Sequence, residues 1–109
     1  MRPVNQTVTT ISAGAWIPLD ITENPTSLSI GCRILAGATA TYGVEYTYDD
    51  PFDTTTPPVA FGYLTQIPAA TAVSKDAQGL TSPVRAVRLN VSAVTGAGVK
   101  MTVLQGVGV

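Results

Sequence analysis

Apolar and polar residues alternate with a period of two over much of this chain. In residues 28–34 the apolar positions are Leu28, Ile30, Cys32 and Ile34. In residues 39–48 they are Ala40, Tyr42, Val44, Tyr46 and Tyr48. This period is that of a β-strand with one buried face, and the short turn Ala36-Gly37-Ala38 between the two segments favours a β-hairpin. We therefore expect residues 28–34 and 39–48 to pair with each other.

The same alternation returns near the C-terminal end of the chain. The apolar positions are Val87, Leu89, Val91 and Ala93, followed by Val99, Met101 and Val103. The turn Thr95-Gly96-Ala97-Gly98 separates them, which predicts a second hairpin. Its opposite face would carry Arg88, Asn90 and Lys100 together, either in water or against a partner.

Weaker patterns complete the predicted fold. Short strands are expected within residues 4–12, 15–19 and 59–67, and long loops at residues 49–58 and 68–83. Threonine occurs sixteen times, and eight prolines and ten glycines interrupt the chain at the spacing of short strands. The sequence therefore predicts an all-β fold: one domain over residues 1–109, an antiparallel β-sandwich of six to eight short strands with jelly-roll-like topology.

Composition narrows the choice of partners. Only 12% of the residues are charged, about half of the ~25% usual in soluble proteins. A surface with so few charges is expected for a protein that remains bound to other protein chains. The net charge is −1 and the six basic residues are scattered, so we expect no nucleic-acid or membrane-surface interface. No secretory signal and no long apolar stretch is present, so we expect synthesis in a cytoplasm.

The residues available for catalysis are few. Histidine is absent, which removes the commonest general base and metal ligand. The lone Cys32 cannot build a structural zinc site, and its apolar neighbourhood predicts a buried thiol. No phosphate-binding glycine loop or nucleophile motif occurs. We therefore expect a protein that is not an enzyme and that has no cofactor and no resident metal.

The first candidate partner-binding residues lie in one loop: Asp49, Asp50, Pro51, Phe52 and Asp53. Three carboxylates in a loop can hold calcium, which prefers several oxygen ligands. Aspartate and proline also build turns, because the carboxylate accepts hydrogen bonds from nearby backbone amides. We favour turn chemistry for the three aspartates. The Phe52 ring is expected either to anchor a partner or to pack on its own domain.

Three further candidates lie outside that loop. Trp16 precedes a short strand ended by Pro18, where it can fill the core or anchor an interface. Arg85 and Arg88 are three residues apart in a predicted strand, so they point to opposite faces. One of them is expected to lean inward and pair with an acid such as Glu45 or an aspartate of residues 49–53. Tyr42, Tyr46 and Tyr48 share a strand face, where a core role is favoured over a sugar site.

Four segments together resemble a known group of proteins. They are Gly14-Ala15-Trp16-Ile17-Pro18-Leu19-Asp20, Val44-Glu45-Tyr46-Thr47-Tyr48-Asp49-Asp50-Pro51-Phe52-Asp53, Pro83-Val84-Arg85-Ala86-Val87-Arg88-Leu89-Asn90-Val91, and Thr102-Val103-Leu104-Gln105-Gly106. In these motifs and in their order along the sequence, the chain is similar to small virion structural proteins of tailed bacteriophages, of the capsid decoration (cement) type. The resemblance covers nearly the whole chain, and it carries over no functional residues.

The resemblance implies a role in assembly. A decoration protein would bind the outside of the major capsid protein shell and stabilise it, as a dimer or trimer on the virion surface, after synthesis in the bacterial host. One alternative is a head–tail connector, tail or fibre-base component of the virion. A second alternative is a carbohydrate-binding β-sandwich, which predicts tyrosines exposed on a platform and calcium near Asp49 and Asp50.

Overall fold

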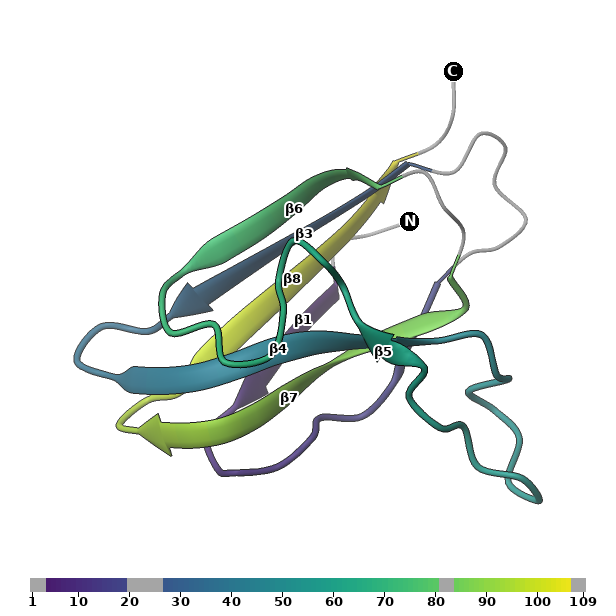
Figure 1. The fold of residues 1–109 in the computed structure, drawn as a ribbon, viewed down its shortest axis with the longest axis horizontal. Coiled ribbons are helices and arrows are strands. Elements are labelled where there is room, and N and C mark those ends of the chain that lie inside the picture. The colour runs from purple at the N-terminus through teal and green to yellow at the C-terminus, as the bar shows by residue number, and fades with distance from the viewer. Residues whose placement is uncertain (1–3, 20–26, 81–83, 107–109) are drawn as a thin grey trace.

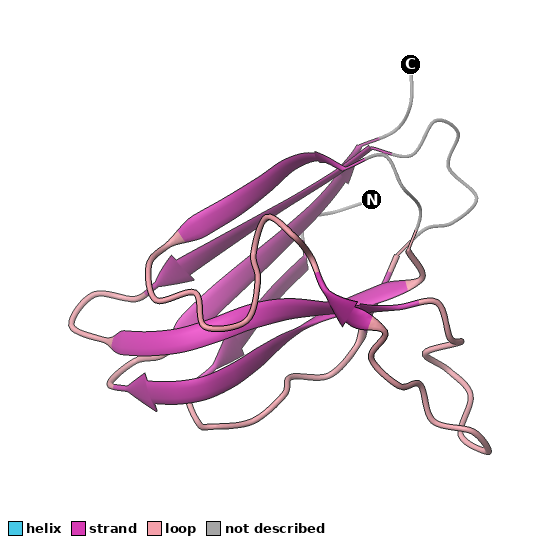
Figure 2. Ribbon diagram, viewed as in Figure 1, coloured by secondary structure: helices cyan, strands magenta, loops and turns pink. Residues whose placement is uncertain are grey.

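The computed structural model describes residues 4–19, 27–80 and 84–106. Their regular secondary structure consists of strands (Figures 1 and 2). The strands are β1 (Val4–Val8), β2 (Ile17–Pro18), β3 (Ser27–Ile34), β4 (Thr39–Thr47), β5 (Gly62–Tyr63), β6 (Lys75–Leu80), β7 (Ala86–Thr95) and β8 (Val99–Gly106). Among these residues, no helix is long and apolar enough to cross a lipid bilayer.

The eight strands form two four-stranded antiparallel sheets. The first has the order β1-β8-β3-β6 and the second the order β2-β7-β4-β5. Strand β1 pairs with β8, β2 with β7, β3 with β6 and β4 with β5. The chain thus runs as one long hairpin whose successive pairs alternate between the two sheets. This is a jelly roll, so the predicted all-β sandwich with jelly-roll topology is confirmed.

The two sheets bury their facing residues against each other, because each strand has a single apolar face. The core members are 0–7% exposed; on the four long strands they are Leu28, Ile30, Cys32, Ala40, Tyr42, Val44, Val87, Leu89, Val91, Val99, Met101 and Val103. The period-two pattern therefore located the core correctly. Tyr48 and Ala93 are exceptions, since both are exposed. Ala93 follows a register shift in the β4–β7 ladder, and such a bulge disrupts the alternation.

The two predicted hairpins are wrong. Strand β3 pairs with β8 over eight residues and β4 pairs with β7 over nine. The turns after β3 and β7 instead carry the chain from one sheet to the other, and both lie at the same end of the sandwich (Figure 1). Alternation shows which face of a strand is buried, and it is the same whether the next strand lies alongside or in the opposite sheet. Arg88 and Lys100 therefore lie in different sheets and share no face.

The predicted loops also need correction. Residues 49–58 do form a loop, whereas the predicted loop at 68–83 contains strand β6, which pairs with β3. The sequence Lys75-Asp76-Ala77-Gln78 is polar because β6 is the edge strand of its sheet and only Ala77 of these four is buried. Residues 81–83 lie outside the described part of the chain. Of the predicted strand at 59–67, only Gly62 and Tyr63 are paired.

Burial changes the acidity of two core side chains. Cys32 is buried, as predicted, and burial raises the pKa of its thiol to about 12. Burial also raises the pKa of Tyr42, whose hydroxyl donates a 2.6 Å hydrogen bond to the Val73 carbonyl oxygen. Both groups are therefore neutral at physiological pH, because their charged forms would lose hydration in the core.

The crossover between β7 and β8 generates a prediction about Gly98. Its φ is +89°, and a Cβ there would overlap the Val8 carbonyl oxygen of β1. We expect Gly98→Ala to lower the free energy of unfolding by at least about 1 kcal/mol, measured by chemical denaturation. Gly31→Ala is the control, because a Cβ at Gly31 meets nothing within 4 Å. Equal stabilities of the two variants would contradict the close approach of Gly98 to the Val8 carbonyl oxygen.

Candidate functional site

A row of polar and aromatic side chains crosses the outer face of the second sheet. The register places Arg88 of β7 opposite Glu45 of β4, and Glu45 opposite Tyr63 of β5. Arg88 Nε donates to Glu45 Oε1 at 3.0 Å, and the guanidinium carbon lies 4.2 Å from the centre of the Trp16 ring. Because opposite residues in a ladder share a face, these four side chains form one continuous strip.

The ion pair in this strip is well shielded. The Glu45 side chain is 10% exposed and that of Arg88 is 25% exposed. A carboxylate with so little access to water depends on its partner for stabilisation. Next to the pair, Asn90 Nδ2 donates to the Tyr63 hydroxyl at 2.9 Å, and the Tyr63 ring covers Gly43 closely enough to leave no space for a Cβ. The strip is therefore a fixed structural surface.

The three aspartates of the loop after β4 all accept hydrogen bonds from backbone amides. Asp49 accepts from the Val59 amide at 3.1 Å and Asp50 from the Phe52 amide at 2.9 Å. Asp53 accepts from the amides of Thr55 and Thr56 at 2.9 and 3.1 Å. This is the turn chemistry favoured by the sequence. Among the described residues, no group of three or more acidic, cysteine or histidine side chains is placed to hold a metal ion.

In this loop and on either side of it are four exposed apolar or aromatic side chains, which we call the aromatic end. Its members and their exposed fractions are Tyr48 (52%), Phe52 (74%), Val59 (67%) and Phe61 (56%). The Tyr48 ring lies edge-on to Phe61, with centroids 5.0 Å apart, and edge-on to the half-buried Tyr46 at 5.5 Å. A monomeric protein rarely groups exposed aromatic rings in this way without a use for them.

The structure brings the predicted site residues together around the start of β7. Arg85, just before β7, lies 3.9 Å from Asp50 of the loop, and Arg88 lies three residues further along. Both arginines thus pair with an acid of the kind expected for one of them, but the expected inward orientation is wrong, because Arg88 pairs on the outer face and the pair of Arg85 is exposed. Trp16 is half-buried and lies on the outer face over Arg88, so it does not fill the core between the sheets. Phe52 points into solvent and does not pack on its own domain.

Sequence reasoning missed several members of these surfaces. Phe61 and Tyr63 lie in the segment 59–67, where a short strand was predicted, but no pattern showed that this segment returns to β4. Gln6 was also missed: its Oε1 accepts from the Leu89 amide at 3.0 Å and its Nε2 donates to the Ala15 carbonyl oxygen at 2.6 Å. These bonds join the edge strand β1 of the first sheet to the second. A lone glutamine in a weak strand gives no signal of such a role.

Compared with known proteins, the chain matches no family model, no curated protein and no solved structure. The functional argument therefore depends on the geometry of the aromatic end and of the two outer faces.

The shielded pair generates a prediction about Arg88. We expect Arg88→Gln to lower the free energy of unfolding by about 1–3 kcal/mol, because it leaves the Glu45 carboxylate without its cation. The fluorescence of Trp16, the single tryptophan, should change in the folded variant. Arg85→Gln is the control: its pair with Asp50 is exposed, so the loss should stay below about 0.5 kcal/mol. A loss at Arg85 as large as that at Arg88 would contradict this assignment.

Proposed function

We propose that this protein is a bacteriophage capsid decoration protein, which binds the outside of the major capsid protein shell, stabilises it and has no catalytic activity. The observation that carries the proposal is the aromatic end: the exposed rings of Tyr48 and Phe61 lie 5.0 Å apart, and Phe52 and Val59 are exposed in the segment that connects them. Grouped apolar side chains of this kind mark protein–protein contacts. The resemblance of the chain to virion proteins of this type points the same way.

The stiffness of the loop supports an anchoring role. The Phe52 ring stands in a turn closed by the hydrogen bond from its own amide to Asp50 and by a second, 3.2 Å bond from the Asp53 amide to the Asp50 carbonyl oxygen. The far side of the loop is tied to β4, because Thr47 Oγ1 donates to the Val59 carbonyl oxygen at 2.9 Å. A loop already ordered before binding loses little conformational entropy on contact with a partner.

The topology is compatible with the proposal and does not establish it. Jelly rolls occur in viral capsid proteins and also in lectins, and a fold does not specify a function. The carbohydrate alternative required tyrosines on an open platform. Tyr42 is fully buried with its hydroxyl bonded to Val73, and Tyr46 is half-buried, so only Tyr48 of the three is exposed. This distribution favours the protein–protein alternative.

Copy number on the virion separates the decoration role from a connector, tail or fibre-base role. Purified protein should be mixed with phage heads assembled without it, the heads pelleted, and the bound copies counted by quantitative gel analysis. We expect a stoichiometry proportional to the major capsid protein, and a higher temperature of head disruption. A small fixed number of copies per particle would instead place the protein at the portal vertex or tail. Absence of binding would favour the carbohydrate-binding alternative.

The aromatic end generates a more local prediction. Phe52→Ser should weaken binding to the heads by about tenfold or more, because an exposed anchor contributes at least ~1.4 kcal/mol to such an interface. Its own stability should change by less than about 0.5 kcal/mol. Ile11→Ser is the matched control: Ile11 is 69% exposed and adjoins Ser12, whose carbonyl pairs with the Val91 amide further along β7. Equal effects of the two substitutions on head binding would show that the aromatic end is not part of the interface.

A further inference from the structure

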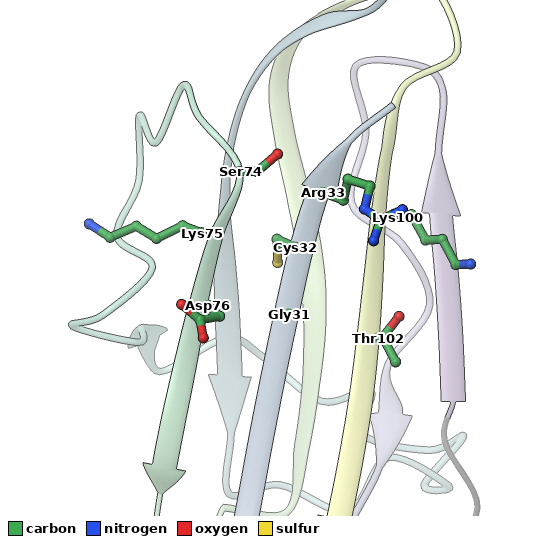
Figure 3. Close-up of a pocket in the computed structure, with 8 residues that line it drawn as sticks. All are labelled: Gly31, Cys32, Arg33, Ser74, Lys75, Asp76, Lys100 and Thr102. Atoms are coloured by element: carbon green, nitrogen blue, oxygen red, sulfur yellow. The ribbon is translucent and has the colours of Figure 1, made fainter. Parts of the chain in front are cut away.

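The outer face of the first sheet contains a hollow that the aromatic end does not use. It has a volume of about 530 Å³, and it is lined from β8, β3, β6 and the residue before β6 by Gly31, Cys32, Arg33, Ser74, Lys75, Asp76, Lys100 and Thr102. Gly31 lies in its floor, with Thr102 and Asp76 as its partners on the neighbouring strands (Figure 3). The volume lies within the range of sites for small ligands or side chains.

The space is open because residue 31 is a glycine, although the fold does not require glycine at this position. Its φ is not in the left-handed region, and a Cβ would meet nothing within 4 Å. By contrast, Gly37, Gly96 and Gly98 have a positive φ, and a Cβ added at Gly14, Gly43 or Gly62 would have other atoms within 4 Å. Glycine within a strand costs about 0.5–1 kcal/mol relative to alanine. The open floor therefore indicates a site kept free for something outside the chain.

Two of the cations around the hollow have no ion pair in the described part of the chain. Arg33 and Lys100 are direct partners in the β3–β8 ladder, so two cations share one face. The ion pairs found in the described part of the chain involve Arg85 and Arg88, and neither Arg33 nor Lys100 has one there. Like charges opposite each other on a sheet repel. An anion bound between them would relieve that repulsion and gain two charge-assisted hydrogen bonds.

The neighbouring polar groups define the anion further. Ser74 Oγ accepts from the Ile34 amide at 3.0 Å, which leaves its hydroxyl proton free to donate. On the other rim, Asp76 receives one hydrogen bond from Gln78 and keeps further acceptor sites. The ligand should therefore present a carboxylate to Arg33 and Lys100 and an N–H donor to Asp76. Asp76 would repel a polyphosphate chain, and no aromatic ring lines the hollow to stack on a sugar.

We propose that this hollow binds an acidic peptide segment of a protein partner, with an aspartate or glutamate side chain between Arg33 and Lys100 and a backbone amide at Asp76. An extended peptide supplies both groups along one strand direction, which matches the open floor over Gly31. The site lies on the opposite sheet from the Glu45–Arg88 strip. It does not depend on the aromatic end, so the two proposals stand or fall separately.

The test uses the purified protein and a fluorescent peptide of alternating aspartate and serine, followed by anisotropy at low salt. We expect saturable binding that weakens as salt increases. The double variant Arg33→Gln/Lys100→Gln should weaken it about tenfold or more. Gly31→Val should do the same with all charges present, because its side chain fills the floor. Thermal unfolding checks that both variants remain folded, and the charge variant decides alone if Gly31→Val does not fold.

Two control ligands give the outcomes that would overturn the proposal. A peptide with asparagine in place of each aspartate should bind at least about tenfold more weakly. Equal binding of the two peptides, or full binding by the charge variant, would show that the hollow does not select carboxylates. Tighter binding of a single-stranded oligonucleotide than of the acidic peptide, lost in the same variants, would show that the ligand is a polyphosphate. Head binding by the charge variant is measured separately and should be unchanged if the aromatic end is the contact.

Discussion

The fold depends on the need of every long strand to cover one apolar face. A single sheet of these strands would leave Tyr42, Leu89 and Met101 in water, so the sheet has to be divided into two layers that face each other. The crossovers after β3 and β7 make the division possible, and both use glycines with positive φ: Gly37, and Gly96 with Gly98. The two crossovers also support each other, since the Leu35 amide donates to the Gly98 carbonyl oxygen at 3.0 Å. The remaining strand pairs follow from this arrangement.

The sequence showed which face of each long strand is buried, but it did not show which strands pair with each other. Its period of two identified the buried members of β3, β4, β7 and β8, because burial acts on each strand separately. Pairing acts between segments far apart in the chain, and a glycine turn such as Ala36-Gly37-Ala38 serves a hairpin or a crossover equally well. Strand β6 was missed for a related reason: only Ala77 of its residues 75–78 is buried, so this edge strand shows no apolar alternation there. At the site, the pairing of one arginine with an acid was predicted, whereas the pairing of both arginines, and the return of the chain at Phe61 and Tyr63, depended on tertiary structure.

The outer faces of the two sheets differ in whether their cations are paired with carboxylates. On the second sheet, Arg88 has a carboxylate beside it and an aromatic ring beneath it, and the Glu45 pair is shielded from water. On the first sheet, Arg33 and Lys100 are ladder partners beside the open floor at Gly31, and neither has an ion pair in the described chain. In a protein with only 12% charged residues, two adjacent cations are a large part of the charge available. The contrast distinguishes a face whose charges are paired within the domain from one whose cations we propose are paired by a partner.

The aromatic end and the hollow also lie at opposite ends of the sandwich. The aromatic end adjoins the start of β7, whereas Lys100 follows the crossover at the end of β7. Ten residues of strand separate these points, a distance of roughly 30 Å at the usual rise of a β-strand. A small domain with an apolar anchor at one end and a cationic hollow at the other can contact two different chains at once. In the proposed decoration role, many copies bound to the shell through the aromatic end would act together, and the hollow of each copy would stay available to a second partner.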